Sequence, residues 1–120
     1  MPAAYEIDAE HGVVRTRLWG VVTDQEVYEH NNRLRSDPKF NSDYRQLVDM
    51  SGITKAEVSA AMIADTAINQ FFEPGSRRAI VASNDAVFGL ARMFALRSES
   101  VGQTIAVYRE RSSAEEWLRG

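Results

Sequence analysis

The sequence predicts an α/β fold with a five-stranded, mixed but mostly parallel sheet, in the order β-β-α-β-α-β-α-β-α. Two observations predict this class. Short apolar runs typical of strands alternate with longer stretches of helical periodicity, and this alternation favours crossover connections between parallel strands. The first two runs are separated only by a short turn, which predicts an antiparallel hairpin at the start of the chain. The length of 120 residues fits a single domain over residues 1–120.

The N-terminal hairpin is predicted from two segments in which apolar and charged residues alternate, residues 5–8 and 13–20. The register that places Asp8 opposite Val13 makes one face of the hairpin apolar. The other face then carries acidic and basic side chains that can pair across the strands, which predicts a solvated face.

The first helix is predicted over residues 23–36, because Thr23 and Glu26 have the spacing of a capping box. Pro38 ends the helix, since the residue before a proline disfavours helical backbone angles. His30 lies between polar neighbours, where we expect a solvated side chain.

A central strand is predicted over residues 46–50, which are apolar toward both faces. Residues 51–54 are expected to form the turn after it. The second helix is predicted over roughly residues 59–72 and ends before Pro74.

The remaining chain continues the alternation of strand and helix. The pattern predicts a strand at 78–82, a helix at 86–98 capped by residues 83–85, a strand at 103–109, and a short helix capped by Ser112 or Ser113. The two arginines before the first of these strands, Arg77 and Arg78, are expected at a sheet edge, solvated or in ion pairs.

The composition excludes several classes of function. The chain has no cysteine, which excludes disulfide scaffolds, thiolate metal sites and thiol nucleophiles. Its two histidines have no neighbours at ligand spacing, so we expect neither a metal nor a cofactor. The net charge of −3 argues against nucleic-acid binding, and no apolar stretch is long enough to span a membrane. Because no secretion signal is recognisable, we expect a cytoplasmic protein.

Two polar residues are candidates for a functional role. Asp49 stands near the carboxyl end of the apolar central strand, where ligands gather in open parallel sheets. It could act as an acid or lie beside a phosphate switch, or it could simply accept backbone N–H bonds or pair with an arginine. Ser59 is placed to begin the second helix, either as its N-cap or as a phosphorylation site at the positive helix end.

The second and third helices carry more apolar residues than one buried stripe requires. This surplus could belong to the ordinary core, line a hydrophobic cavity or form a dimer face, and the sequence leaves all three open. The residues expected to form an apolar binding surface are Met62, Phe72, Phe88 and Met93.

Residues 47–54, Leu-Val-Asp-Met-Ser-Gly-Ile-Thr, followed by a serine that opens a helix, resemble the STAS domain of sulfate transporters and anti-sigma-factor antagonists. Segments 44–52, 77–82 and 88–94 resemble small stand-alone bacterial proteins described as anti-sigma-factor-antagonist-like or STAS/CRAL-TRIO-like, most of them uncharacterised. The resemblance covers nearly the whole chain and implies a STAS-like fold.

STAS antagonists carry Asp-Ser-Ser-Gly at the start of a helix, and its second serine is phosphorylated. The matching residues here are Glu57, Val58, Ser59 and Ala60, so the first serine and the glycine are absent. The resemblance therefore implies Ser59 as a possible phosphoacceptor, with Asp49, Ser51 and Glu57 as its neighbours. CRAL-TRIO relatives bind lipids in an apolar cavity.

These patterns favour a non-catalytic regulatory or protein-interaction module, which would bind a protein partner or a second copy of itself through the second and third helices. The alternative is a carrier or sensor of a small apolar or lipid-like ligand. An enzyme that uses Asp49 with an arginine is the least favoured reading, because the sequence shows no catalytic constellation.

Overall fold

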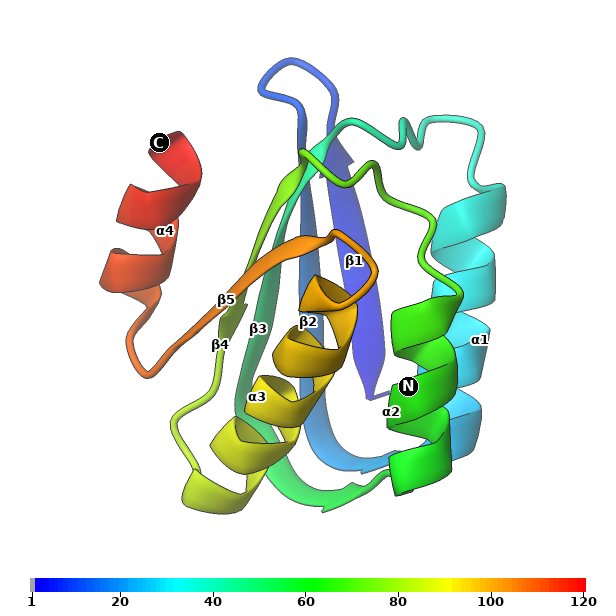
Figure 1. Cartoon of the computed structure of the whole chain (residues 1–120), viewed down its shortest axis with the longest axis vertical. Coiled ribbons are helices and arrows are strands. Elements are labelled where there is room, and N and C mark those ends of the chain that lie inside the picture. The colour runs from blue at the N-terminus through cyan, green and yellow to red at the C-terminus, as the bar shows by residue number, and fades with distance from the viewer. Residues whose placement is uncertain (1) are drawn as a thin grey trace.

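The computed structural model describes residues 2–120, which form a five-stranded sheet with four helices packed on it (Figure 1). The strands are β1 (Ala3–Asp8), β2 (Val13–Thr23), β3 (Arg45–Glu57), β4 (Arg77–Val81) and β5 (Thr104–Tyr108). The helices are α1 (Asp24–Ser36), α2 (Ala60–Ile68), α3 (Asp85–Glu99) and α4 (Arg111–Arg119). The predicted order of elements is confirmed.

The strands lie side by side in chain order, from β1 at one edge to β5 at the other. β1 and β2 pair antiparallel with Asp8 opposite Val13, so the predicted hairpin register is confirmed. The pairs β2–β3, β3–β4 and β4–β5 are parallel. The sheet is therefore mixed and mostly parallel, as predicted.

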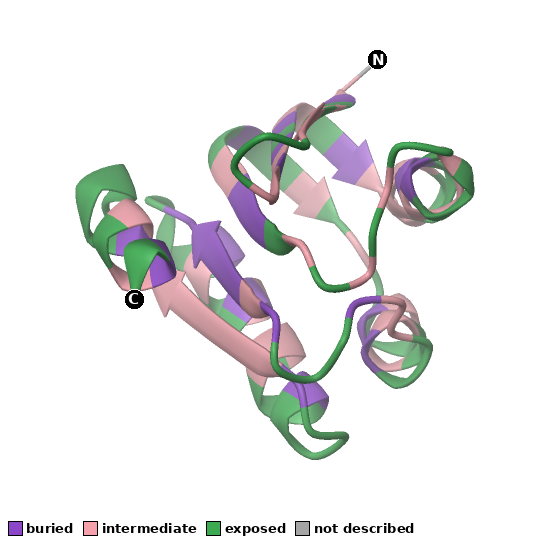
Figure 2. Ribbon diagram, turned by 90° about the horizontal axis from the view of Figure 1, so that it is seen from above, coloured by how far each residue is buried: buried purple, intermediate pink, exposed green. Residues whose placement is uncertain are grey.

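The helices α1, α2 and α3 cover one face of the sheet, and α4 alone packs on the other (Figure 1). Successive side chains of a strand point to opposite faces, and β3 shows this directly. Val48 belongs to the core beneath α3, whereas Leu47 packs against Ala114 and Leu118 of α4. Seen from above, the most buried strand segments lie between these two layers (Figure 2).

β3 is longer than the sequence predicts. The residues expected to form a turn, 51–54, lie inside the strand. β2 also continues as far as Thr23 and pairs with β3 up to Glu57, beyond two register shifts. The turn prediction is wrong because this distant partner satisfies backbone groups that a turn would otherwise pair locally.

α2 is shorter than predicted and ends at Ile68 instead of continuing to residue 72. The backbone and side-chain amides of Asn69 donate to the carbonyl oxygen of Asp65 at 2.9 and 3.0 Å, which closes the last turn. Ile68, the last residue of the helix, is 70% exposed. Phe72 then lies in the loop after the helix, buried against Phe40.

The starts of α1 and α3 follow the predicted capping, and the start of α4 does not. The Glu26 carboxylate accepts hydrogen bonds from the backbone and hydroxyl of Thr23 at 3.0 and 2.9 Å. The Asn84 side chain accepts the backbone N–H of Ala86 at 2.8 Å and caps α3. α4 begins after Glu110 without a side-chain cap bond, so the predicted serine cap is wrong. Across residues 2–120, no helix has the length and apolar character needed to cross a bilayer.

Candidate functional site

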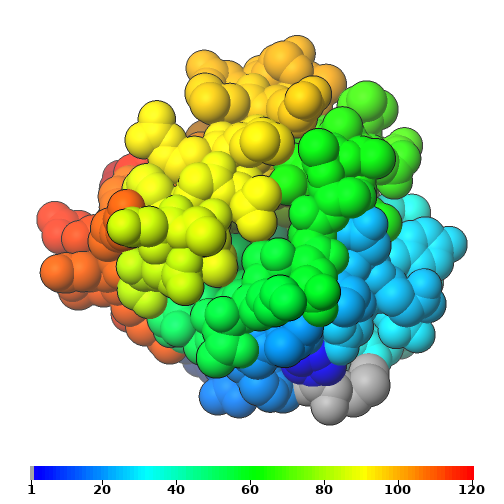
Figure 3. Space-filling model, turned by 90° about the horizontal axis from the view of Figure 1, so that it is seen from below, coloured from blue at the N-terminus to red at the C-terminus, as the bar shows by residue number. Residues whose placement is uncertain are grey.

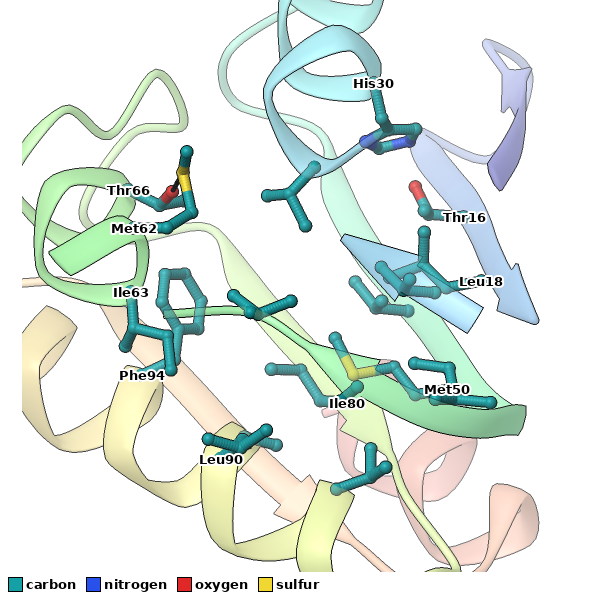
Figure 4. Close-up of a pocket in the computed structure, with 18 of the residues that line it drawn as sticks. Thr16, Leu18, His30, Met50, Met62, Ile63, Thr66, Ile80, Leu90 and Phe94 are labelled. Atoms are coloured by element: carbon teal, nitrogen blue, oxygen red, sulfur yellow. Dashed lines mark hydrogen bonds between the residues drawn. The ribbon is translucent and has the colours of Figure 1, made fainter. Parts of the chain in front are cut away.

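A cavity of about 140 Å³ lies between the sheet and the three helices α1, α2 and α3. Its walls are predominantly aliphatic. They are formed by alternate residues of β2, β3 and β4 and by residues on the inward faces of α2 and α3. Figure 4 shows these side chains converging on the pocket. They include Leu18, Met50, Ile63, Ile80, Leu90 and Phe94.

One end of the cavity is polar. Thr16, Gln46 and Arg78 lie on adjacent strands and share the cavity face. The Gln46 amide nitrogen donates to the Thr16 hydroxyl at 3.1 Å, and Arg78 Nε donates to the Gln46 amide oxygen at 3.1 Å. A buried polar row therefore crosses the amino-terminal parts of β3 and β4.

Arg78 is the charged centre of this row and is only 7% exposed. Its Nη1 donates to the amide oxygens of Gln70 and Gln103, and its guanidinium lies 4.3 Å from the centre of the Phe72 ring. Burial lowers the pKa of Arg78 to about 9, so the side chain still carries its charge at neutral pH. The cavity wall thus includes a buried cation held by amide groups.

His30 of α1 lies on the same wall and is 5% exposed. Its ring meets Tyr5 edge-on with 5.7 Å between centroids, and Nδ1 lies 3.4 Å from the side-chain oxygen of Asn31. Nε2 is buried and has no hydrogen-bond partner within residues 2–120. Burial lowers the pKa of His30, so the ring favours its neutral form. His30 and Thr16 both line the cavity (Figure 4).

The far end of the cavity lies toward the carboxyl ends of the parallel strands, where Val22, Ile53 and Val58 line it. Seen from below, α3 and the green segments of β3 and α2 meet around a narrow hollow (Figure 3). In open α/β sheets, ligands commonly bind at this end of the strands. The cavity therefore has an apolar end near the surface and a polar end deep in the fold.

No protein family matches the sequence, and no curated protein is significantly similar to it. Among solved structures, the chain is similar to an uncharacterised protein of the DUF3478 family with a SpoIIAA-like fold, from Shewanella loihica PV-4. The TM-score is 0.63 at 14% sequence identity, and the match covers 97% of this chain and 93% of the other. The chain has a SpoIIAA-like fold. This confirms the expected STAS-like architecture, and at this identity the similarity establishes the fold alone.

In this SpoIIAA-like fold, Asp49 lies outside the cavity. Its carboxylate accepts hydrogen bonds from the backbone N–H and hydroxyl of Ser51 at 2.9 and 2.6 Å. Arg111 of α4 lies 3.6 Å from the other carboxylate oxygen. These contacts match the interpretation in which Asp49 accepts a backbone N–H and pairs with an arginine, on the sheet face opposite the cavity.

Ser59 forms the N-cap of α2. Its hydroxyl accepts the backbone N–H of Met62 at 3.0 Å and donates to the Asp24 carboxylate at 2.7 Å. The backbone N–H of Ser59 also donates to Asp24, at 2.8 Å. Glu57 precedes Ser59 by two residues, and its carboxylate lies 3.9 Å from the Lys55 ammonium. Phosphorylation of Ser59 stays a prediction, and the negative charge of Asp24 would oppose it.

The four residues expected to form one apolar surface lie in different parts of the SpoIIAA-like fold. Met62 lines the cavity, whereas Phe72 is buried in a separate aromatic cluster. Phe88 packs on the core, with the Arg109 guanidinium 4.1 Å from its ring centre, and Met93 is exposed. Of the four, Met62 alone lines the cavity wall.

His30 was expected to be solvated, and Arg78 was expected at a sheet edge, solvated or in an ion pair. Both expectations are wrong, because both side chains are buried and β4 lies between β3 and β5. The signal that could have found them is periodicity. His30 lies three residues after Val27 and four before Leu34, on the buried stripe of α1. Arg78 lies two residues before the buried Ile80, on the same face of β4.

No cluster of three His, Asp or Glu side chains that could hold a metal ion is found in the part of the chain that the structure describes. The cavity wall supplies amide, hydroxyl, imidazole and guanidinium groups. This arrangement can bind a small molecule by apolar contact and orient one polar group at its deep end.

Proposed function

We propose that this protein is a non-catalytic carrier or sensor that binds a small apolar molecule in the cavity between the sheet and helices α1 to α3. The cavity carries the proposal, through its volume of about 140 Å³ and its aliphatic walls. A cavity of about 150 Å³ with similar walls holds benzene in another protein. The part of the ligand inside the cavity therefore has about six non-hydrogen atoms.

The energetics of the cavity support this proposal. The apolar wall atoms of an unfilled cavity lack dispersion contacts on their open side. A ligand that fills the cavity restores these lost contacts and stabilises the folded state by mass action. A protein of this size gains a measurable increase in melting temperature from such binding.

The test is a thermal-shift and NMR titration with toluene and hexanol as probes, on wild type and two matched variants. Ala91→Leu extends a side chain from a buried position on the cavity wall, and Ala86→Leu makes the same change at an exposed position of the same helix. We expect wild type and Ala86→Leu to bind the probes and Ala91→Leu to lose binding. Absence of binding in wild type, or unchanged binding in Ala91→Leu, would contradict the proposal.

A second candidate is the interaction module, and one observation favours it. Ile68 and Leu96 are 70% and 60% exposed, near the carboxyl ends of α2 and α3. The two helix ends are neighbours, because Gln70 donates to the Ser98 hydroxyl at 2.9 Å. If this surface pairs with a second copy, sedimentation will show dimers in wild type and monomers in Leu96→Glu. A wild-type monomer at every concentration would contradict it.

A further inference from the structure

Arg78 is buried in the cavity wall without an acidic partner. No salt bridge to Arg78 is formed within residues 2–120, and no aspartate or glutamate of these residues lines the cavity. A buried charge without a counter-charge is costly, and soluble proteins usually pair it. The fold therefore retains an uncompensated positive charge beside an apolar space.

The groups around Arg78 satisfy its hydrogen bonds only in part. Three glutamine amide oxygens, from Gln46, Gln70 and Gln103, accept from Nε and Nη1. Nη2 has no acceptor among the described residues 2–120. Amide groups neutralise no charge, so the guanidinium keeps both its net charge and a free donor for an incoming acceptor.

The glutamines are themselves held in place, which makes the polar end a built site. The Gln103 amide nitrogen donates to the carbonyl oxygen of Phe72 at 3.1 Å, and that of Gln70 donates to Ser98 at 2.9 Å. Gln46 is fixed by Thr16, as described above. The orientation of the guanidinium is therefore set before any ligand arrives, which lowers the cost of binding.

His30 provides a second unsatisfied group on the same cavity wall. Its Nε2 is buried and lacks a partner in the described chain. A neutral imidazole with a protonated Nε2 donates one hydrogen bond, and a carboxylate has two oxygens that accept such bonds. Two residues of the cavity wall, Arg78 and His30, thus each keep an unused donor, and one of these donors is charged.

We infer that the ligand of the proposed cavity is a small monocarboxylic acid with a short branched or aromatic apolar group, and that its carboxylate binds at Arg78. This inference rests on the proposed binding function. The carboxylate of the ligand enters the cavity first. Arg78 and Gln46 lie at the amino ends of β4 and β3, whereas the apolar walls continue toward the carboxyl ends of the strands, where the cavity lies near the surface. The cavity volume of about 140 Å³ limits how much of an acyl chain can lie inside it.

The test compares acids with alcohols of the same carbon skeleton, so that only the head group changes. The probe pairs are 3-methylbutanoate with 3-methylbutan-1-ol, and benzoate with benzyl alcohol, titrated by calorimetry at pH 7. We expect each acid to bind at least about tenfold more tightly than its alcohol. Both can accept a hydrogen bond from the guanidinium, but only the carboxylate also carries an opposite charge. Equal affinities would overturn the carboxylate inference and leave the proposed cavity binding intact. Absence of binding by all four probes would overturn both.

Two arginine variants locate the head group. Arg78→Met removes the buried charge, and Arg77→Met removes the neighbouring arginine, which points away from the cavity and donates to the carbonyl oxygen of Trp117 at 2.7 Å. The preference for acids should disappear in Arg78→Met and persist in Arg77→Met. A preference that persists in Arg78→Met would overturn the assignment.

A second measurement serves if Arg78→Met does not fold. In wild type, the side-chain N–H resonance of Arg78 should shift on addition of benzoate and stay in place on addition of benzyl alcohol. The same shift with both probes would overturn the assignment, because the head group would then have no specific contact with the guanidinium.

Discussion

Replacing His30 with phenylalanine should remove a pH-dependent loss of stability. The His30 ring is buried, lies edge-on to Tyr5, and has an Nε2 without a partner in the described chain. Burial therefore lowers the pKa of His30 below its ordinary value of 6.5. The hydrogen bond to Asn31 acts against this change, and the positive charge of Arg33 adds to it.

The direction of the effect follows from proton linkage. The unfolded chain binds a proton on His30 at a higher pH than the folded protein does, so stability is complete above about pH 6.5 and falls as the pH decreases. Each pH unit below that value costs up to about 1.4 kcal/mol, until the pKa of the folded state is reached.

Other groups titrate in a different range. Hydrogen bonds from His11 to Asp8 and from Tyr5 to Asp37 lower the pKa values of these two carboxyl groups below 3.8. Their contribution to stability is therefore present above that value and is lost only as the pH falls further. The interval between pH 6.5 and pH 5 therefore lies above the range in which these two carboxyl groups titrate.

The assay is urea unfolding followed by tryptophan fluorescence at pH 7.5, 6.5, 5.5 and 5.0. We expect the free energy of unfolding of wild type to fall below pH 6.5 and that of His30→Phe to stay nearly constant over this interval. His11→Gln is the control, because the His11 side chain is exposed, and it should retain the wild-type slope. The same slope in wild type and His30→Phe would refute the assignment of this effect to His30.

Two further predictions concern the helices. Gly89→Ala should raise the free energy of unfolding by roughly 0.5–1 kcal/mol in urea titrations, because an added Cβ meets no atom within 4 Å and glycine disfavours a helix interior; a loss of stability would contradict this. Ser59→Ala should cost about 1 kcal/mol through loss of the α2 cap. Ser59→Asp should lower the free energy of unfolding further, because a second carboxylate would face Asp24. If Ser59→Asp is instead as stable as wild type, and intact mass shows phosphate on the wild-type protein, phosphorylation of Ser59 would be favoured.

The candidate site was predictable only in its apolar part. A hydrophobic cavity was one of three interpretations left open by the apolar surplus of the second and third helices, and Met62 does line it. The polar end was missed because its chemistry comes from burial. Arginine, glutamine and histidine are usually exposed, and nothing local marks Arg78 or His30 as exceptions apart from their position on a buried face.

The sequence by itself determined the order of strands and helices, the register of the N-terminal hairpin, and the starts of α1 and α3. These features depend on periodicity, turns and caps, in which the interacting residues are neighbours in the chain. Only the tertiary structure decided where β3 ends, because its distant partner β2 supplies the competing backbone contacts. It also decided the surroundings of Arg78, whose partners Gln46 and Gln103 lie 32 and 25 residues away in the chain. A buried charge takes its environment from such distant residues, and no local pattern specifies them.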